Sequence, residues 1–237
     1  MHRRFLDQEI AYTGAQLRSG WIAQITAGSA GPPAGRMEGS LPHEAPVSEE
    51  TGRSGDAAVA FLGPCDVAPE YMVDTVDLQA GARIFSPRMV HIIVEHPALG
   101  LAHITTRQRL LIAIAAEIIN AALGEPLVRR EGDDLYLRDR KLSVSVATVS
   151  GASAACPGTA GFSLPSPNPQ AEACATLPAA SGLIHAGFNL RGEGAPVAAI
   201  GLEELGLDPR AFAERLLAAY AAEIAGIASA AAKVRPV

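Results

Sequence analysis

The sequence predicts a single α+β domain in which a mixed, mostly antiparallel sheet is flanked by helices. Three observations support this prediction. Short runs rich in Val and Ile alternate along the chain with longer stretches of helical periodicity. The chain has 237 residues, which is enough for one ordinary domain. Hydrophobic residues make up 49% of it, which is enough to build a core.

Two segments are expected to be insertions into this domain, which is predicted to span residues 1–237. Residues 27–56 have no apolar periodicity and predict a disordered loop. Residues 151–182 are rich in Pro, Gly and Ala and predict a flexible loop. Both are interpreted as surface insertions that the fold tolerates.

Short apolar runs predict a series of strands along the rest of the chain. They are expected at residues 57–62, 82–85, 89–95, 126–130, 134–138, 141–149, 183–189 and 197–200. The pair Asp139-Arg140 is typical of a two-residue turn, so the strands on either side of it are expected to form a hairpin.

Three helices are predicted. Apolar spacing indicates a first helix over residues 6–24. A second is expected over residues 106–123, where Thr105 and Gln108 form a capping-box pattern. The dipeptide 208–209, Asp-Pro, predicts the N-cap and first position of a final helix.

Charge and composition exclude several classes of protein. A formal net charge of −6 argues against a general nucleic-acid binder. No apolar stretch approaches the ~18 residues of a membrane span, and the basic N-terminus is not followed by a signal-peptide core. Three cysteines do not indicate a disulfide scaffold. We therefore expect a cytoplasmic protein that binds neither membranes nor DNA.

Lys141 is the residue that most suggests chemistry. It is one of two lysines in the chain, whereas arginine supplies the other basic residues. Strand alternation places Lys141 on one face with Ser143 and Ser145, and Val144 and Val146 on the opposite, core-facing side. Small side chains beside an ammonium leave room for a carboxylate or phosphate ligand. The alternative is an exposed lysine on a half-solvated sheet.

The surrounding motif resembles a known superfamily. Gly132-Asp133-Asp134-Leu135, a short turn and then Lys141-Leu142-Ser143 are similar to segments of the biotin and lipoate protein ligases, which share the class II aminoacyl-tRNA synthetase fold. By motif position, Asp134 corresponds to their pocket aspartate. Lys141 corresponds to the lysine that contacts the acyl-adenylate. The run 183–187 is similar to the strand that follows in those enzymes and brings His185 to the pocket.

The chain also resembles the uncharacterised family called domain of unknown function 366. This resemblance covers nearly all of the chain outside the two insertions. It is carried by Tyr12-Thr13-Gly14, Gly63-Pro64-Cys65-Asp66-Val67, Met72-Val73-Asp74, Val94-Glu95-His96, Arg107-Gln108-Arg109, Gly132-Asp133-Asp134-Leu135, Lys141-Leu142-Ser143 and Lys233-Val234-Arg235-Pro236.

Together the resemblances imply a ligase or acyltransferase that acts on a small carboxylic acid, or on its acyl-adenylate or thioester. ATP with Mg²⁺ would be the cofactor, and an acceptor protein or tRNA a further partner. Lys141 and Asp134 would be catalytic. The residues expected to contact substrate are Asp133, Ser143, Ser145, His185, Arg107, Arg130 and Cys65.

Three of these expectations rest on residue type. Arg107 opens the second predicted helix, where a positive N-terminus favours an anion, and Arg130 precedes the motif. Cys65 is either a nucleophile or a small buried thiol. The spacing of the histidines does not indicate a metal site.

A second interpretation is a ligase fold that binds a small acid or a protein partner without catalysis. Lipoate ligases carry a glycine run one strand before the motif, where the acyl chain and nucleotide approach the backbone. Residues 81–89 hold bulky side chains and no glycine run there. The retained aspartate and lysine favour an enzyme, and the missing glycines favour a binding module.

Overall fold

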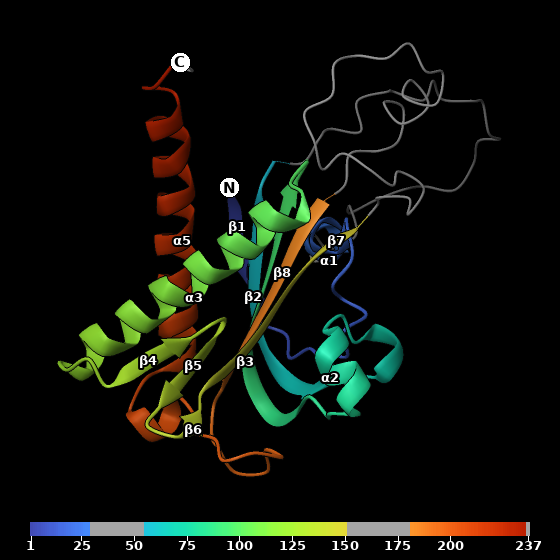
Figure 1. The fold of residues 1–237 in the computed structure, drawn as a ribbon, viewed down its shortest axis with the longest axis vertical. Helices are drawn as coiled ribbons and strands as arrows, with labels where there is room; N and C mark the ends of the chain where they lie inside the picture. The colour runs from blue at the N-terminus through green and yellow to red at the C-terminus, as the bar shows by residue number, and fades with distance from the viewer. Residues whose placement is uncertain (29–54, 151–180, 236–237) are drawn as a thin grey trace, which may run out of the picture.

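A computed structural model describes residues 1–28, 55–150 and 181–235 and has the predicted α+β class (Figure 1). Its main sheet has five strands in the order β1-β2-β3-β8-β7. These strands are β1 (His2–Phe5), β2 (Ala57–Asp66), β3 (Phe85–Pro97), β8 (Ser181–Asn189) and β7 (Ser143–Ser150). All neighbours are antiparallel except β1, which pairs with β2 in parallel at one edge.

A second, three-stranded sheet lies beside the first and carries the motif. It consists of β4 (Val128–Glu131), β5 (Asp134–Leu137) and β6 (Arg140–Lys141), in that order. The predicted hairpin is present, but Leu137 pairs with Arg140, so its turn is Arg138-Asp139, one position earlier than expected. Arg138 adopts the left-handed conformation there, with φ of 54°.

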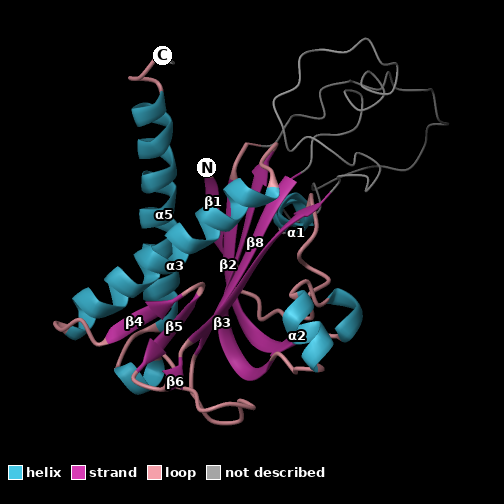
Figure 2. Ribbon diagram, viewed as in Figure 1, coloured by secondary structure: helices cyan, strands magenta, loops and turns pink. Residues whose placement is uncertain are grey.

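The helices cover both faces of the main sheet (Figure 2). α3 (Leu101–Leu123) and α5 (Pro209–Ala231) pack on one face, and α1 (Trp21–Gly28) packs on the other. Two shorter elements, η1 (Pro69–Tyr71) and α2 (Thr75–Ala80), precede β3, and η2 (Glu203–Leu205) precedes α5.

Both faces of β2 are buried, which explains its continuous apolar run. Ala58 and Ala60 belong to the core under α3 and α5. Val59 and Phe61 belong to the core on the opposite face, together with Trp21 of α1. Alternate side chains of a strand point to opposite faces, so a strand between two layers must be apolar throughout.

The predicted first helix, over residues 6–24, is wrong. Residues 2–5 form an edge strand, and α1 begins only at Trp21. Gly14 and Gly20 explain the difference, because their φ angles of 91° and 77° lie outside the helical region.

Three strand predictions also need correction. Residues 82–85 and 89–95 were expected as separate strands, but β3 is continuous over Phe85–Pro97. The predicted strand over 141–149 is interrupted at Leu142, which separates β6 from β7. Residues 197–200 form only an isolated bridge between Ala199 and Lys141.

The two long helices are confirmed, with one changed start. α3 begins at Leu101 rather than at residue 106, so Thr105 and Gln108 lie inside the helix and form no capping box. The Asp208 carboxylate accepts a hydrogen bond of 2.7 Å from the Ala211 backbone, which caps α5 as predicted. None of the helices in the described part of the chain is long and apolar enough to cross a membrane.

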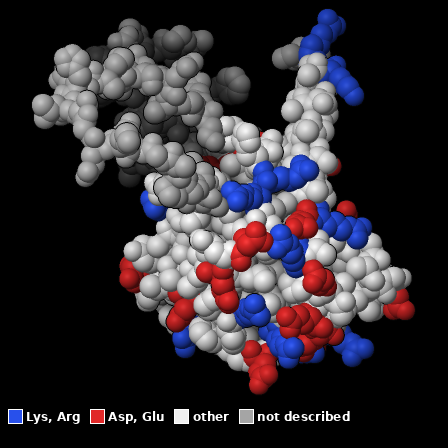
Figure 3. Space-filling view, turned by 180° about the vertical axis from the view of Figure 1, so that it is seen from behind, with Lys and Arg blue, Asp and Glu red and all other residues white. Residues whose placement is uncertain are grey.

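The predicted insertions fall almost wholly outside the described residues; only their edges belong to α1 and β8. Seen from behind, acidic and basic side chains of the described part are interspersed over the surface (Figure 3).

Candidate functional site

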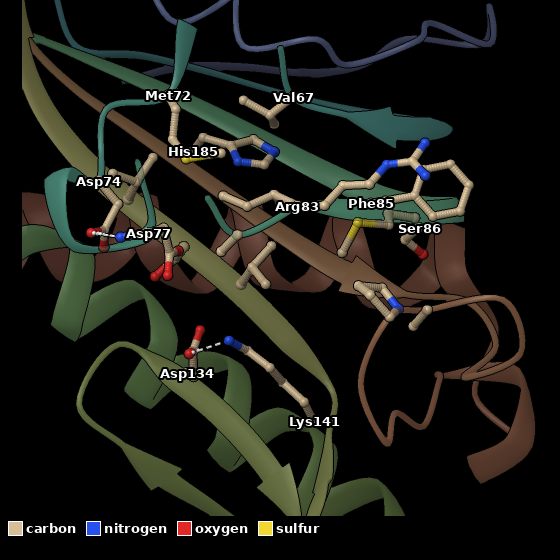
Figure 4. Close-up of a pocket in the computed structure, with 18 of the residues that line it drawn as sticks. Val67, Met72, Asp74, Asp77, Arg83, Phe85, Ser86, Asp134, Lys141 and His185 are labelled. Carbon is tan, nitrogen blue, oxygen red and sulfur yellow. Dashed lines mark hydrogen bonds and ion pairs between the residues drawn. The ribbon is translucent and has the colours of Figure 1, made fainter. Parts of the chain in front are cut away.

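A cavity of about 320 Å³ lies where the two sheets meet (Figure 4). Its walls come from residues 71–77 around the start of α2, from the beginning of β3, from β7, and from the loop 195–199. The motif hairpin, which is the β4–β5 pair joined by the turn at Gly132-Asp133, completes it together with Lys141 of β6 and with β8. Its volume is at the lower end of the range for small-molecule sites, roughly 300–1,000 Å³.

Lys141 and Asp134 form an ion pair in this cavity. The Lys141 Nζ atom lies 2.7 Å from Asp134 Oδ2, and the two side chains are 27% and 21% exposed. The Lys141 backbone is held on both sides, because its N–H donates to Ala198 and its carbonyl accepts from Ile200. Lys141 is therefore fixed at the junction of the two sheets.

The charges of the cavity act on both members of the pair. Burial lowers the pKa of Lys141, but the hydrogen bond and charge of Asp134 outweigh burial and leave that pKa raised. Burial raises the pKa of Asp134, and Lys141 only partly offsets this. Asp133 and Asp77 add negative charge that raises it further. The pair thus lies in an acidic environment.

Asp133 and Ser145 are held by a residue that the sequence did not single out as part of the site. Gln108, buried in α3, donates from Nε2 to Asp133 Oδ2 at 3.0 Å and to Ser145 Oγ at 2.9 Å. The Ser145 hydroxyl in turn donates to the Asp133 carbonyl at 2.7 Å. The available signal was a polar residue on the apolar face of α3, between Ile104 and Leu111.

His185 lines the cavity, as expected, and belongs to a buried aromatic stack. Tyr12 lies parallel to it, with ring centroids 3.6 Å apart. His185 Nε2 is 3.0 Å from Nδ1 of His91, whose Nε2 is 3.2 Å from the Gly63 carbonyl oxygen. Burial lowers the pKa of His91 to about 4, and burial together with His91 lowers that of His185, so both rings are neutral at neutral pH.

Other lining residues were not predicted. Asp74 accepts from the backbone of Val76 and Asp77 and caps α2, which places Asp77 in the cavity wall. Arg83 also lines the cavity, and its Nη2 atom lies 3.1 Å from Asp66 Oδ2. Figure 4 shows Asp74 and Asp77 at one side and Ser86 beside Phe85 at the other.

Four predicted substrate residues lie elsewhere. Cys65 is fully buried in the core, where burial and then Asp66 raise its pKa to about 12, so it is a thiol at neutral pH. Ser143 is also fully buried, and its hydroxyl accepts from the Leu135 backbone. Arg107 lies on α3 beside Tyr220, and Arg130 is exposed and donates to the Gly132 carbonyl.

The two faces of β7 are the reverse of the prediction. Val144 and Val146 were expected in the core, yet both line the cavity. Ser143 instead faces the hairpin, whereas Ser145 bonds to Gln108 of α3 and still reaches the cavity. The interruption at Leu142 explains this, because a shift of one residue exchanges the faces of a strand.

Within residues 1–28, 55–150 and 181–235, no group of three or more His, Cys, Asp or Glu side chains is arranged to hold a metal ion.

Comparison with known proteins identifies the family. Residues 43–157 and 172–235 match the family described as Domain of unknown function (DUF366). The chain belongs to this family. A protein of unknown function from Pyrococcus horikoshi is 31% identical over 100% of this chain and 99% of that one, with a TM-score of 0.72.

Two further similarities are more limited. An uncharacterized protein of Methanocaldococcus jannaschii is 34% identical over 158 residues, 64% of this chain, and the chain spans only 58% of that protein's length. The biotin protein ligase from Leishmania major, solved in complex with biotin, is 13% identical over 92% of this chain and 72% of that one. The TM-score of this match is 0.41.

Proposed function

We propose that this DUF366 protein is a ligase or acyltransferase whose cavity binds a small carboxylic acid, or its acyl-adenylate or thioester. The observation that carries the proposal is the Lys141–Asp134 pair, held at 2.7 Å inside the cavity. A cation fixed by its backbone and shielded from bulk water is suited to stabilise negative charge that develops on an acyl or phosphate oxygen.

Asp134 has two roles in this proposal. It keeps the ammonium of Lys141 protonated and oriented while no ligand is present, since its charge raises the pKa of that ammonium. When a carboxylate or phosphate oxygen approaches, the ammonium can donate a second hydrogen bond to it without leaving Asp134, because it carries three donors. His185 and Ser145 line the walls on which such a ligand would lie.

The acidic side chains of the cavity fit a nucleotide that arrives with Mg²⁺. Magnesium bound in this way needs only one or two protein carboxylates, with water and phosphate completing its coordination. Asp77 and Asp134 both line the cavity and could supply them. ATP would activate the acid, so that a carboxylate oxygen bonds to the α-phosphorus and pyrophosphate leaves. An acceptor protein or tRNA would then receive the acyl group, and AMP would leave.

A second candidate is a binding module without catalysis, and one observation favours it. The segment that leads into β3 carries bulky side chains in the cavity wall, Arg83 and Ile84 before the strand and Phe85 at its first position, where the ligases have glycines. Such a module would bind a small acid in the same cavity but would release no pyrophosphate.

A thermal-shift screen with a pyrophosphate assay tests the proposal. ATP, AMP, lipoate, biotin and fatty acids are offered to the wild type, to Lys141→Met and to Lys233→Met, a matched control at an exposed position in the turn after α5. We expect a ligand at a hundredfold excess over Kd to stabilise wild type and control by ~2.7 kcal/mol and Lys141→Met much less. Acid-dependent pyrophosphate release supports the ligase. Binding without release, and without acyl transfer from a thioester, supports the binding module.

A further inference from the structure

One carboxylate holds together the loop between β8 and η2, residues 190–202. Glu204 Oε2 accepts a hydrogen bond of 2.6 Å from the Gly192 N–H and one of 2.9 Å from the Gly201 N–H. These two glycines lie near the two ends of the loop, and the segment between them supplies one wall of the cavity. The Glu204 side chain therefore closes the loop at its base.

The backbone at the base of this loop is closely packed. A Cβ atom at Gly192 would lie 2.1 Å from the Ala199 carbonyl oxygen. A Cβ atom at Gly201 would lie 2.1 Å from the Leu190 carbonyl carbon. Because glycine has no Cβ atom, the two ends of the loop can approach closely enough for one carboxylate to bind both N–H groups.

The other oxygen of Glu204 binds the residue next to Lys141. Oε1 accepts from Arg140 Nη2 at 2.7 Å, and Arg140 Nε donates to the Ala199 carbonyl at 2.8 Å. Burial raises the pKa of Glu204, but the three hydrogen bonds that its carboxylate accepts outweigh burial and leave that pKa lowered. The carboxylate is therefore ionised at neutral pH, and its hydrogen bonds are charge-assisted.

The position of Lys141 depends on this loop, because its own strand is very short. β6 consists of Arg140 and Lys141 alone. On the side away from β5, the Lys141 backbone exchanges hydrogen bonds of 2.8 and 3.0 Å with residues 198–200 of the loop. Strands usually have at least about three residues. The loop therefore completes the support of β6, and Glu204 joins the loop to it.

From these contacts we infer that Glu204 is a positioning residue of the cavity, which fixes the Lys141 backbone and thereby holds the ammonium beside Asp134. Glu204 is not among the described residues that line the cavity, so it acts through Arg140 and the loop. The effect of this support on acid binding rests on the proposed function, whereas its effect on Lys141 does not.

The lysine content of the chain allows a direct test. Lys141 and Lys233 are its two lysines, so protein made with ¹³C-labelled lysine gives two sets of side-chain signals in an NMR spectrum. Lys233 is exposed and provides the reference for a lysine without a buried partner. We expect the Lys141 signal to move toward that of Lys233 in Glu204→Ala, because the ammonium is no longer held beside Asp134.

Two further variants control this experiment. Glu203→Ala is the matched control, since Glu203 is the neighbour of Glu204 in η2 but pairs with Arg191 at the surface, at 2.7 Å. It should leave the Lys141 signal in place. Glu204→Gln keeps an acceptor oxygen and loses the charge, so it should shift the signal less than Glu204→Ala. It also serves as the test variant if Glu204→Ala does not fold.

Amide exchange separates positioning from a general effect on stability. In Glu204→Ala, we expect the N–H groups of Lys141 and Ile200 to exchange about tenfold or more faster relative to those of the central strand β3, because the loop opens while the main sheet stays folded. Glu203→Ala should not change this ratio. Exchange that accelerates equally in the loop and in β3 would mean that Glu204 only stabilises the fold, and would overturn the inference.

Calorimetry with octanoate, lipoate and biotin distinguishes this inference from the proposed function. An acid that binds the wild type should bind Glu204→Ala about tenfold more weakly and Glu203→Ala equally well. If Glu204→Ala leaves the Lys141 signal and the exchange unchanged, the inference fails and the proposed function does not. If the Lys141 signal moves but acids bind as before, or if no acid binds the wild type, the proposed function fails and Glu204 still positions Lys141.

Discussion

Gln108 and Asp133 lie 25 positions apart and are joined by a hydrogen bond of 3.0 Å from the Gln108 amide to the Asp133 carboxylate. The same amide nitrogen also donates to Ser145 on β7. One buried side chain of α3 therefore positions both the turn of the motif hairpin and the edge strand of the main sheet. It touches the cavity only through the residues that it holds.

We expect Gln108→Leu to lower the free energy of unfolding by about 1–2 kcal/mol, because Asp133 and Ser145 lose a buried donor. It should also weaken acid binding, since the hairpin that carries Asp134 loses its anchor. Gln79→Leu, on the exposed surface of α2, provides the control. Urea unfolding and the thermal-shift screen measure the two effects. An unchanged ligand shift in Gln108→Leu would show that the hairpin does not need this contact.

Breaking the ion pair should cost stability, and removing both charges should restore it. Lys141→Met leaves the half-buried Asp134 carboxylate without its partner, and we expect a loss of about 2 kcal/mol at neutral pH. The double variant Lys141→Met with Asp134→Asn should recover most of this loss. Chemical denaturation of the wild type, of the single variants Lys141→Met and Asp134→Asn, and of the double variant gives the coupling free energy between the two side chains. A coupling near zero would mean that the two side chains do not interact in solution.

The buried histidine pair should make stability depend on pH. The folded-state pKa of His91 is about 4, below its ordinary value of 6.5, so the unfolded chain binds a proton that the folded protein excludes. The contribution of the neutral His91 to the free energy of unfolding is fully present above pH 6.5 and is lost as the pH falls toward 4. The His91 contribution to this loss is roughly 3 kcal/mol.

His91→Gln should reduce the slope of the free energy of unfolding against pH. The reduction should correspond to at most about one bound proton. Tyr12→Phe is the matched control, because it keeps a ring stacked on His185 and removes no group that titrates in this range. Guanidinium unfolding at a series of pH values provides the measurement. A slope identical in wild type and His91→Gln would show that another group is responsible.

Two glycines should differ sharply in their tolerance of alanine. At Gly63, a Cβ atom would lie 1.9 Å from the Ile10 carbonyl oxygen, so the backbone must move. At Gly124, nothing lies within 4 Å, and only the left-handed φ of 75° opposes the substitution. We expect Gly124→Ala to cost about 1 kcal/mol and Gly63→Ala at least about 3 kcal/mol. Equal costs in thermal unfolding would contradict the close approach of Ile10.

The sequence predicted the class of the fold because the apolar periodicities of β2, α3 and α5 are long and regular. It failed where a tertiary contact decides the local structure. The N-terminal strand β1 contains His2, Arg3 and Arg4, and no apolar pattern marks it. The continuity of β3 was equally invisible, because Pro87 and Arg88 separate its two apolar runs. Their partners lie on strands distant in the chain.

The centre of the site was predicted better than its walls. Motif position placed Lys141 and Asp134 together, and the structure pairs them. Residue type and local alternation predicted that Cys65 and Ser143 belong to the site. Neither kind of evidence indicates which other part of the chain covers that face of the strand. Gln108 could not be assigned to the site, since its importance comes from a contact across 25 positions.

The closed pair of Lys141 and Asp134 also couples acid binding to protons. A carboxylate that accepts a second hydrogen bond from the Lys141 ammonium brings its negative charge close to Asp134, whose pKa burial, Asp133 and Asp77 already raise. The added charge raises the pKa of Asp134 further. On the proposed function, the acid and a proton on Asp134 therefore favour each other's binding, so the protein would hold the acid more tightly as the pH falls.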